Sequence, residues 1–323
     1  MSNFENRIDL TQLSQKIDEL REEASRALIG QRVMFDLIMT ALFARGHVLI
    51  EGVPGIAKTL AAKLIAKLID ADFKRIQFTP DLMPSDVLGT SVFNPKSTSF
   101  EYKKGPIFSN LVLIDEINRA PAKTQASLFE VMEEKQISND GETYPLENLF
   151  MVLATQNPIE QEGTYRLPEA QLDRFIFKIV VDYPDGKEES EILQMTDENT
   201  NHHKLDFIKS VLSKEEIVSI RENLEKIMMK ESLINYIVQL IGQTRDHHSL
   251  YLGASPRASI DLMKSSKAFA AIQGRDFVSP EDIRQLFRPV VEHRIILSPE
   301  AELQGITIKE VTEQVLQQVE VPK

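Results

Sequence analysis

One short segment combines glycines with a lysine and a threonine, the residue types that surround bound phosphate groups. The segment is Gly52-Val53-Pro54-Gly55-Ile56-Ala57-Lys58-Thr59, and Leu60 follows it. Its glycines let backbone N–H groups converge on a phosphate, while Lys58 can reach the terminal phosphates and Thr59 can bind magnesium. Ala57 replaces the glycine of the strict pattern, yet alanine enters a helix readily. We predict a nucleoside triphosphate site over residues 52–60; an ordinary glycine-rich turn is the alternative.

A second motif places two carboxylates directly after an apolar run. The run is Leu111-Val112-Leu113-Ile114, and Asp115 and Glu116 follow it. A buried strand would deliver both acids to its carboxyl end, where ligands bind in open α/β sheets. Asp115 can hold Mg²⁺ through its water shell, and Glu116 can orient or deprotonate an attacking water. The alternative is that the acids cap the next helix.

A third apolar run, Phe150–Ala154, ends in polar amides that include Asn157. Asn157 is placed to position the attacking water opposite Glu116. The following Pro158 leaves a strand-end turn as an equally weighted alternative, because Asn-Pro favours turns. Together the three motifs predict ATP hydrolysis with Mg²⁺.

These motifs require strands that bring them to one edge of a sheet. Short apolar runs alternate with helical patterns from about residue 32 to residue 182, and runs that are apolar throughout suit a mostly parallel sheet buried on both faces. We therefore predict a three-layer α/β/α nucleotide-binding domain. The expected strands are His47–Glu51, Lys74–Phe78, Leu111–Ile114, Phe150–Ala154 and Phe175–Val181.

Helical patterns occupy both ends of the chain. Apolar residues from Leu10 to Leu28 recur at spacings of three and four, which predicts an amphipathic helix ending near Gly30. A polar stretch over 197–203 without periodicity predicts a linker, so that residues 1–196 form the nucleotide-binding domain and residues 205–323 an all-helical lid. Helix starts in the lid are predicted at Ser213 with Glu216, Ser255-Pro256, Ser279-Pro280 and Ser298-Pro299.

Composition restricts the class of protein. The 323 residues include 37 lysines and arginines against 49 aspartates and glutamates, a net charge of −12, which argues against nucleic acid as the main partner. The chain has no run of about 18 apolar residues and no signal peptide pattern, so we expect a cytoplasmic protein without a transmembrane segment. The absence of cysteine excludes disulfides and thiolate metal sites.

Taken in order, these motifs resemble those of AAA+ ATPases, and the resemblance narrows to the MoxR family. The family's own phosphate loop carries alanine before the lysine, as here. One departure is Arg166, where the family tends to have proline. Besides residues 52–59, the segments that carry the resemblance are Asp115-Glu116-Ile117-Asn118-Arg119-Ala120-Pro121-Ala122-Lys123-Thr124-Gln125 and Leu167-Pro168-Glu169-Ala170-Gln171-Leu172-Asp173-Arg174-Phe175.

The resemblance implies a homo-oligomeric ring, usually a hexamer, with ATP between neighbouring subunits. Arg174 then matches an arginine finger that acts in trans; the alternative is a surface arginine paired with Asp173 or Glu169. Arg257 matches the sensor-2 arginine of the lid. It stands in the first turn of a predicted helix, where a cation opposes the helix dipole by roughly 0.3–1 kcal/mol, and a nearby phosphate would reverse that penalty.

Further segments are assigned by the same resemblance. Gly30 and Gln31 resemble the adenine-contacting segment, with a helix C-cap at Gly30 as the alternative. Insertions are expected over Thr90–Phe108 and in a hairpin around Gln136–Pro145, where Asn139-Asp140-Gly141 is a strong turn signal. The pairs His202-His203 and His247-His248 lack the partners of a metal site.

The resemblance also implies a biological role. MoxR proteins typically work with von Willebrand factor A domain proteins and help to mature client proteins or insert their metal cofactors. The alternatives are a chelatase-type motor subunit, a nucleic-acid translocase of the same clade, and a nucleotide-gated scaffold without turnover. Against the scaffold stand Glu116, Asn157 and Arg174, which are all present.

Overall fold

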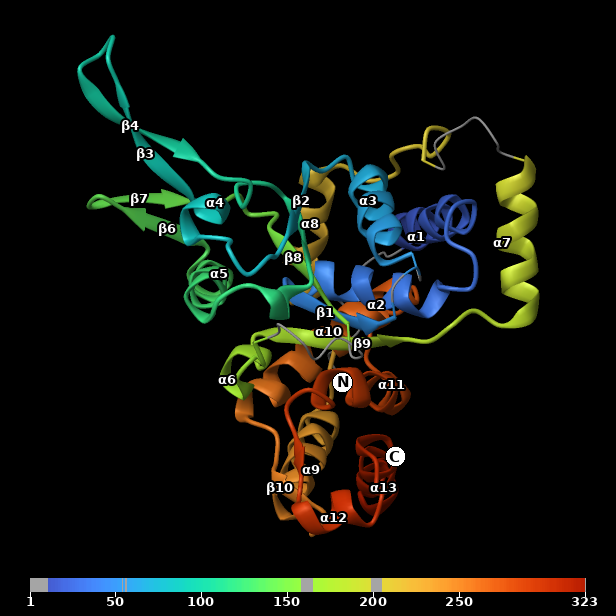
Figure 1. Ribbon diagram of the computed structural model, residues 1–323. Coiled ribbons are helices and arrows are strands. Elements are labelled where there is room, and N and C mark those ends of the chain that lie inside the picture. Colours follow the sequence, from blue (N-terminus) through green and yellow to red (C-terminus); the bar gives the residue numbers. More distant parts are fainter. Residues whose placement is uncertain (1–10, 54, 56, 158–164, 199–204, 323) are drawn as a thin grey trace.

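The computed structural model describes residues 11–53, 55, 57–157, 165–198 and 205–322, without the side chains of residues 195–198. Its centre is a five-stranded sheet in the order β2-β5-β8-β1-β9, and all four strand pairs are parallel (Figure 1). The strands are β1 (His47–Gly52), β2 (Phe73–Gln77), β5 (Leu111–Asp115), β8 (Met151–Gln156) and β9 (Phe175–Val181). Each of the five predicted strands is confirmed to within two residues at either end.

Side chains of the central strands alternate between two buried layers. In β1, Val48 and Ile50 face one apolar cluster and Leu49 faces the other, as the two-residue period of a strand requires. The first cluster is completed by α1 (Thr11–Ser25), α2 (Arg32–Phe43) and α3 (Lys58–Leu68) and continues into apolar residues between 208 and 315. The second is completed mainly by α5 (Ala122–Glu134) and α4 (Pro84–Leu88). The predicted three-layer α/β/α arrangement is therefore confirmed.

Two hairpins extend together from one side of the sheet (Figure 1). They are β3 (Gly89–Asn94) with β4 (Ser99–Lys104), and β6 (Gln136–Asn139) with β7 (Glu142–Pro145). Positive φ angles of 50° at Asp140 and 83° at Gly141 form the predicted turn of the second hairpin. The hairpins also touch one another, because Tyr102 stacks on Tyr144 with ring centroids 4.3 Å apart.

The chain after β9 is mainly helical, as predicted. Its helices are α7 (Gly186–Glu198), α8 (Lys214–Leu224), α9 (Glu231–Asp246), α10 (Pro256–Ile272), α11 (Pro280–Val291), α12 (Pro299–Leu303) and α13 (Ile308–Gln318). A short antiparallel pair, β10 (Leu250–Leu252) with β11 (Ile296–Leu297), was not indicated by the pattern because each strand is only two or three residues long. None of the helices in the described ranges combines the length and apolar character needed to cross a bilayer.

Three of the four predicted helix starts have the expected hydrogen bond. Ser213, Ser279 and Ser298 each accept a backbone N–H from the first turn of their helix. Ser255 precedes α10 at the predicted position, yet its side chain makes no capping bond within the described structure and donates instead to the Asp173 carboxylate. It therefore joins the lid to the nucleotide-binding domain.

The start of the lid packs on the α/β layers. Where the described chain resumes after the predicted linker, the N–H groups of Val211 and Leu212 donate to the Leu68 carbonyl at the end of α3. Arg221 of α8 is buried and donates to the carbonyls of Leu42 and Asn148. Residues 205–224 thus lie against the sheet domain, and the division of the chain between residues 196 and 205 stays a prediction.

Candidate nucleotide site

The three predicted motifs meet at the carboxyl edge of the sheet. The phosphate loop follows β1, Glu116 follows β5 and Asn157 follows β8. Because β5, β8 and β1 are neighbours and parallel, these residues emerge at the same edge. The strand order therefore brings together Lys58, Thr59, Asp115, Glu116 and Asn157 without any further assumption.

The phosphate loop has the backbone geometry of an anion cradle. Gly55 has a φ of 89°, and Ala57 is left-handed with a φ of 60° immediately before α3 begins at Lys58. Thr59 and Leu60 lie in the first turn of α3, whose N–H groups are free of helical partners by geometry. A Cβ added at Gly55 would meet no atom within 4 Å, so the loop borders open space. Pro54 and Ile56 lie outside the described residues.

Lys58 and Val53 attach the loop to the sheet and to the core. The Lys58 ammonium group donates to the carbonyl of Gly52, the last residue of β1, so it is folded back over the loop. Val53 packs against the apolar cluster on the α3 side of the sheet. A lysine in this position can transfer its hydrogen bonds to a phosphate that occupies the loop.

The two acids are held by different contacts. Asp115 is only 7% exposed; its carboxylate accepts the Thr155 hydroxyl at 3.1 Å and the Arg75 guanidinium at 2.5 Å. Glu116 has a φ of 57° and accepts hydrogen bonds from Gln77 at 2.7 Å and Arg119 at 2.8 Å. Glu116 precedes the following 3-10 turn, yet its side chain makes no capping hydrogen bond to that turn in the described structure.

Thr155 connects the Asp115-Glu116 motif to the strand that leads to Asn157. Its hydroxyl donates to Asp115 and accepts the Glu116 backbone N–H at 3.0 Å. Asn157, two residues further on, is 8% exposed at the end of β8. Thr155, Arg75 and Gln77 were missed from the sequence. Thr155 and Gln77 stand at or near the carboxyl end of a predicted strand, which is the signal that could have found them, whereas Arg75 lies in the middle of β2 and carries no such signal.

Thr59 and Asp115 suit Mg²⁺ by their chemistry. Both offer hard oxygen donors, and Mg²⁺ is typically bound by one or two protein oxygens together with substrate phosphates and waters. The ion would supply charge neutralisation on the phosphate oxygens. The Arg75 contact shows that the Asp115 carboxylate already attracts a cation.

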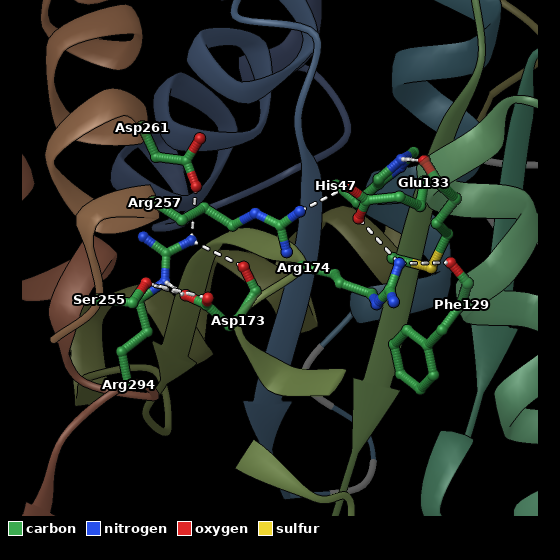
Figure 2. A network of polar contacts seen from close by, with 10 residues as sticks. His47, Phe129, Glu133, Asp173, Arg174, Ser255, Arg257, Asp261 and Arg294 are labelled. Atoms are coloured by element: carbon green, nitrogen blue, oxygen red, sulfur yellow. Dashed lines mark hydrogen bonds and ion pairs between the residues drawn. The ribbon is translucent and has the colours of Figure 1, made fainter. Parts of the chain in front are cut away.

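Arg174 and Arg257 lie at the other edge of the sheet. Arg174 directly precedes β9, and Arg257 is the second residue of α10. Both bind the same carboxylate, Glu133 at the end of α5, with distances of 2.8 Å from Arg174 and 2.5 Å from Arg257 (Figure 2). Arg174 also donates to the Phe129 carbonyl at 3.1 Å.

The two acids that the alternative assigned to Arg174 as surface partners are engaged elsewhere. Asp173 pairs with Arg294 at 3.0 Å, and Glu169 pairs with Arg166 at 3.4 Å (Figure 2 shows the former). The alternative in which Arg174 pairs with Asp173 or Glu169 is therefore wrong, because Glu133 takes that place.

The length of the strands separates the two groups of residues. β1 contains 6 residues, which at a rise of about 3.3 Å per residue span about 17 Å between its first and last Cα atoms. An arginine side chain is much shorter than that distance. Neither arginine, as placed here, reaches the phosphate loop of its own chain.

A buried histidine lies beside the two arginines. His47 begins β1; its Nδ1 accepts the Val152 N–H at 3.0 Å, so its Nε2 carries the proton and donates to the Met132 carbonyl at 3.3 Å. Burial lowers the pKa of His47 to about 4. The ring is therefore neutral at pH 7 and adds no charge to this edge.

The segment expected to contact adenine connects two helices. α1 ends at Ser25 and α2 begins at Arg32, so Gly30 does not cap the first helix and that alternative is wrong. Gly30 has a φ of 71°, and an added Cβ would lie 2.4 Å from the Glu188 carboxyl group. Gln31 is the residue that precedes α2. The adenine contact at Gly30 and Gln31 stays a prediction.

Comparison with known proteins gives a consistent assignment. The family model described as ATPase family associated with various cellular activities (AAA) matches residues 47–177, and the AAA lid domain model matches residues 242–318. A crystal structure of a Cytophaga hutchinsonii protein described as a candidate ATPase has a TM-score of 0.90 and 44% identity, covering 98% of this chain and 97% of that chain.

The sheet, the motif-bearing edge and the lid thus define a protein of the AAA+ ATPase class. YeaC of Bacillus subtilis is 46% identical over 93% of this chain and 93% of its own length. Chaperone MoxR1 of Mycobacterium tuberculosis is 40% identical over 93% of this chain and 81% of its own length. The chain belongs to the MoxR family.

Proposed function

We propose that the chain hydrolyses ATP at interfaces between the subunits of a ring and uses the cycle to remodel client proteins. The observation that supports this most directly is the separation of the predicted site residues into two groups at opposite edges of one sheet. Each subunit would then carry one half of a site at each edge, and head-to-tail association would complete every site.

Individual roles follow from the residue chemistry. The phosphate loop and Lys58 would bind the triphosphate, and Thr59 with Asp115 would hold Mg²⁺. Glu116 would orient or deprotonate the attacking water with help from Asn157. Arg174 and Arg257 would come from the neighbouring subunit and stabilise charge on the transferred phosphoryl group, because within one chain they point away from the loop.

The client side of the proposal rests on family membership. A von Willebrand factor A domain protein as partner and a role in metal cofactor insertion are what the MoxR family suggests for this chain. The two projecting hairpins, linked by the stacked Tyr102 and Tyr144, are the surfaces we assign to client contact.

The first experiment compares the wild type with Glu116→Gln. ATP turnover is measured at steady state, and light scattering reports particle mass with and without ATP. We expect the wild type to turn ATP over, and the variant to bind ATP, lose turnover by about a hundredfold or more and accumulate as rings. Equal turnover of the two proteins would remove Glu116 from the mechanism, and ATP binding without turnover or assembly would favour the scaffold alternative.

A further inference from the structure

Glu133 is the shared partner of both arginines assigned to the neighbouring subunit's nucleotide. It is 39% exposed, and each of its two carboxylate oxygens accepts one guanidinium (Figure 2). The remaining acids nearby are occupied, since Arg294 binds Asp173 at 3.0 Å and Asp261 at 2.5 Å. A single carboxylate therefore holds both cations.

The surroundings of Glu133 are strongly basic for a chain of net charge −12. A cavity of about 590 Å³ opens between the sheet domain and the lid, and Glu133, Arg174 and Arg257 line it. Only two other carboxylates line this cavity within the described structure, Glu225 and Asp261. Five further basic side chains line it as well: Arg45, Lys135, Arg221, Lys264 and Lys267.

The cations in this cavity are not fully neutralised. Arg174 Nε is buried and has no hydrogen-bond partner among the described residues. Burial is the main cause that lowers the pKa of Lys135, and the charges of Arg221, Arg45 and Lys264 lower it further, so the basic side chains of this cavity repel one another. A polyphosphate is the kind of anion that such a cavity would attract.

Helix dipoles explain why the contact with Glu133 is exchangeable. Glu133 is in the last turn of α5 and Arg257 in the first turn of α10, so each charge faces the helix end of its own sign. Their ion pair offsets both penalties while no other anion is present. A phosphate beside Arg257 would offset the α10 penalty better, because it brings more charge and more acceptor oxygens.

We propose that Glu133 acts as an internal substitute for phosphate: it holds Arg174 and Arg257 in the nucleotide-free subunit and yields them to the neighbouring subunit's ATP when the ring closes. This inference rests on the proposed ring ATPase. It adds that Glu133 competes with the neighbouring subunit's ATP for the two arginines. Glu133 is a positioning residue, and it opposes assembly by the free energy needed to release the two arginines.

The test measures assembly rather than turnover. In a Glu116→Gln background, which keeps rings from turning over ATP, sedimentation velocity is recorded across ATP concentrations for the parent, for Glu133→Gln and for the matched control Glu134→Gln. Glu134 carries the same charge one position away but does not line the cavity. Removing the Glu133 charge should lower the ATP concentration for half-maximal ring formation by about fivefold, the effect of a half-exposed ion pair.

The control should match the parent, and without nucleotide only Glu133→Gln should unfold at a slightly lower temperature, because it loses the two ion pairs that hold the arginines. A residue that merely supports the fold would shift assembly in the opposite direction. An unchanged or increased ATP requirement in Glu133→Gln, with rings forming normally in the parent, would overturn this inference alone. Failure of the parent to form rings at any ATP concentration would overturn the proposed ring as well.

Discussion

The placement of Lys58 and Arg174 at opposite edges of the sheet predicts that two inactive variants restore activity when mixed. Lys58→Ala removes a phosphate ligand but leaves Arg174 intact, whereas Arg174→Ala does the reverse. Alone, each should lose nearly all turnover, the arginine finger by about 10³-fold or more. When the two variants are mixed one to one, an interface is complete if an Arg174→Ala subunit supplies the loop and a Lys58→Ala subunit supplies the arginine.

Random mixing makes about one quarter of the interfaces complete, because each side is correct about half of the time. Phosphate release per subunit should therefore reach about one quarter of the wild-type rate. The control mixes wild type with a Lys58→Ala, Arg174→Ala double variant, and sites shared between subunits again give about one quarter. If both residues served one chain, the first mixture would stay inactive and the control would retain about half; that result would refute the trans assignment.

Two predictions concern stability. In the unfolded chain His47 binds a proton below its ordinary pKa of 6.5, whereas in the folded chain it binds one only below about pH 4. Lowering the pH from 6.5 to about 4 should therefore decrease the unfolding free energy by about 3 kcal/mol. Urea unfolding at pH 7 and pH 4 checks this: between the two pH values His47→Asn should lose about 3 kcal/mol less unfolding free energy than the wild type. An equal decrease in the two proteins would show that His47 is not responsible. Ala57→Gly should raise the unfolding free energy by about 0.5–1 kcal/mol, because glycine relieves the left-handed backbone at φ 60°. Urea unfolding at pH 7 checks it, and a less stable variant would contradict it.

The sheet and its motif-bearing edge could be predicted because they depend on local patterns. A run such as Leu111–Ile114 is apolar throughout only where both faces are buried, and the acids that follow it have no alternative but the carboxyl edge. The turn at Asp140 and Gly141 is likewise determined by adjacent residues that tolerate positive φ.

What could not be predicted depends on residues distant in the sequence. Glu133 is 41 positions from Arg174 and 124 from Arg257, and no periodicity links a residue of α5, the residue before β9 and a residue of α10. Ser255 carries an ordinary helix-start signal, but its hydroxyl turns to Asp173 because α10 meets the sheet domain there. The end of α1 at Ser25 was misplaced because the apolar spacing continues through Leu28 after the helix has stopped.

The helix α5 has a mechanical consequence. It begins six residues after Glu116, and its last turn leads directly into β6 of the paired hairpins. Its 13 residues make a rod of about 20 Å. A tilt of about 10° at the Glu116 end would move the hairpin end of α5 by about 3 Å, and β6, which follows α5 in the chain, would move with it. The stacked Tyr102 and Tyr144 would make both hairpins move together. A displacement that starts beside the acids would therefore reach the projecting hairpins through α5.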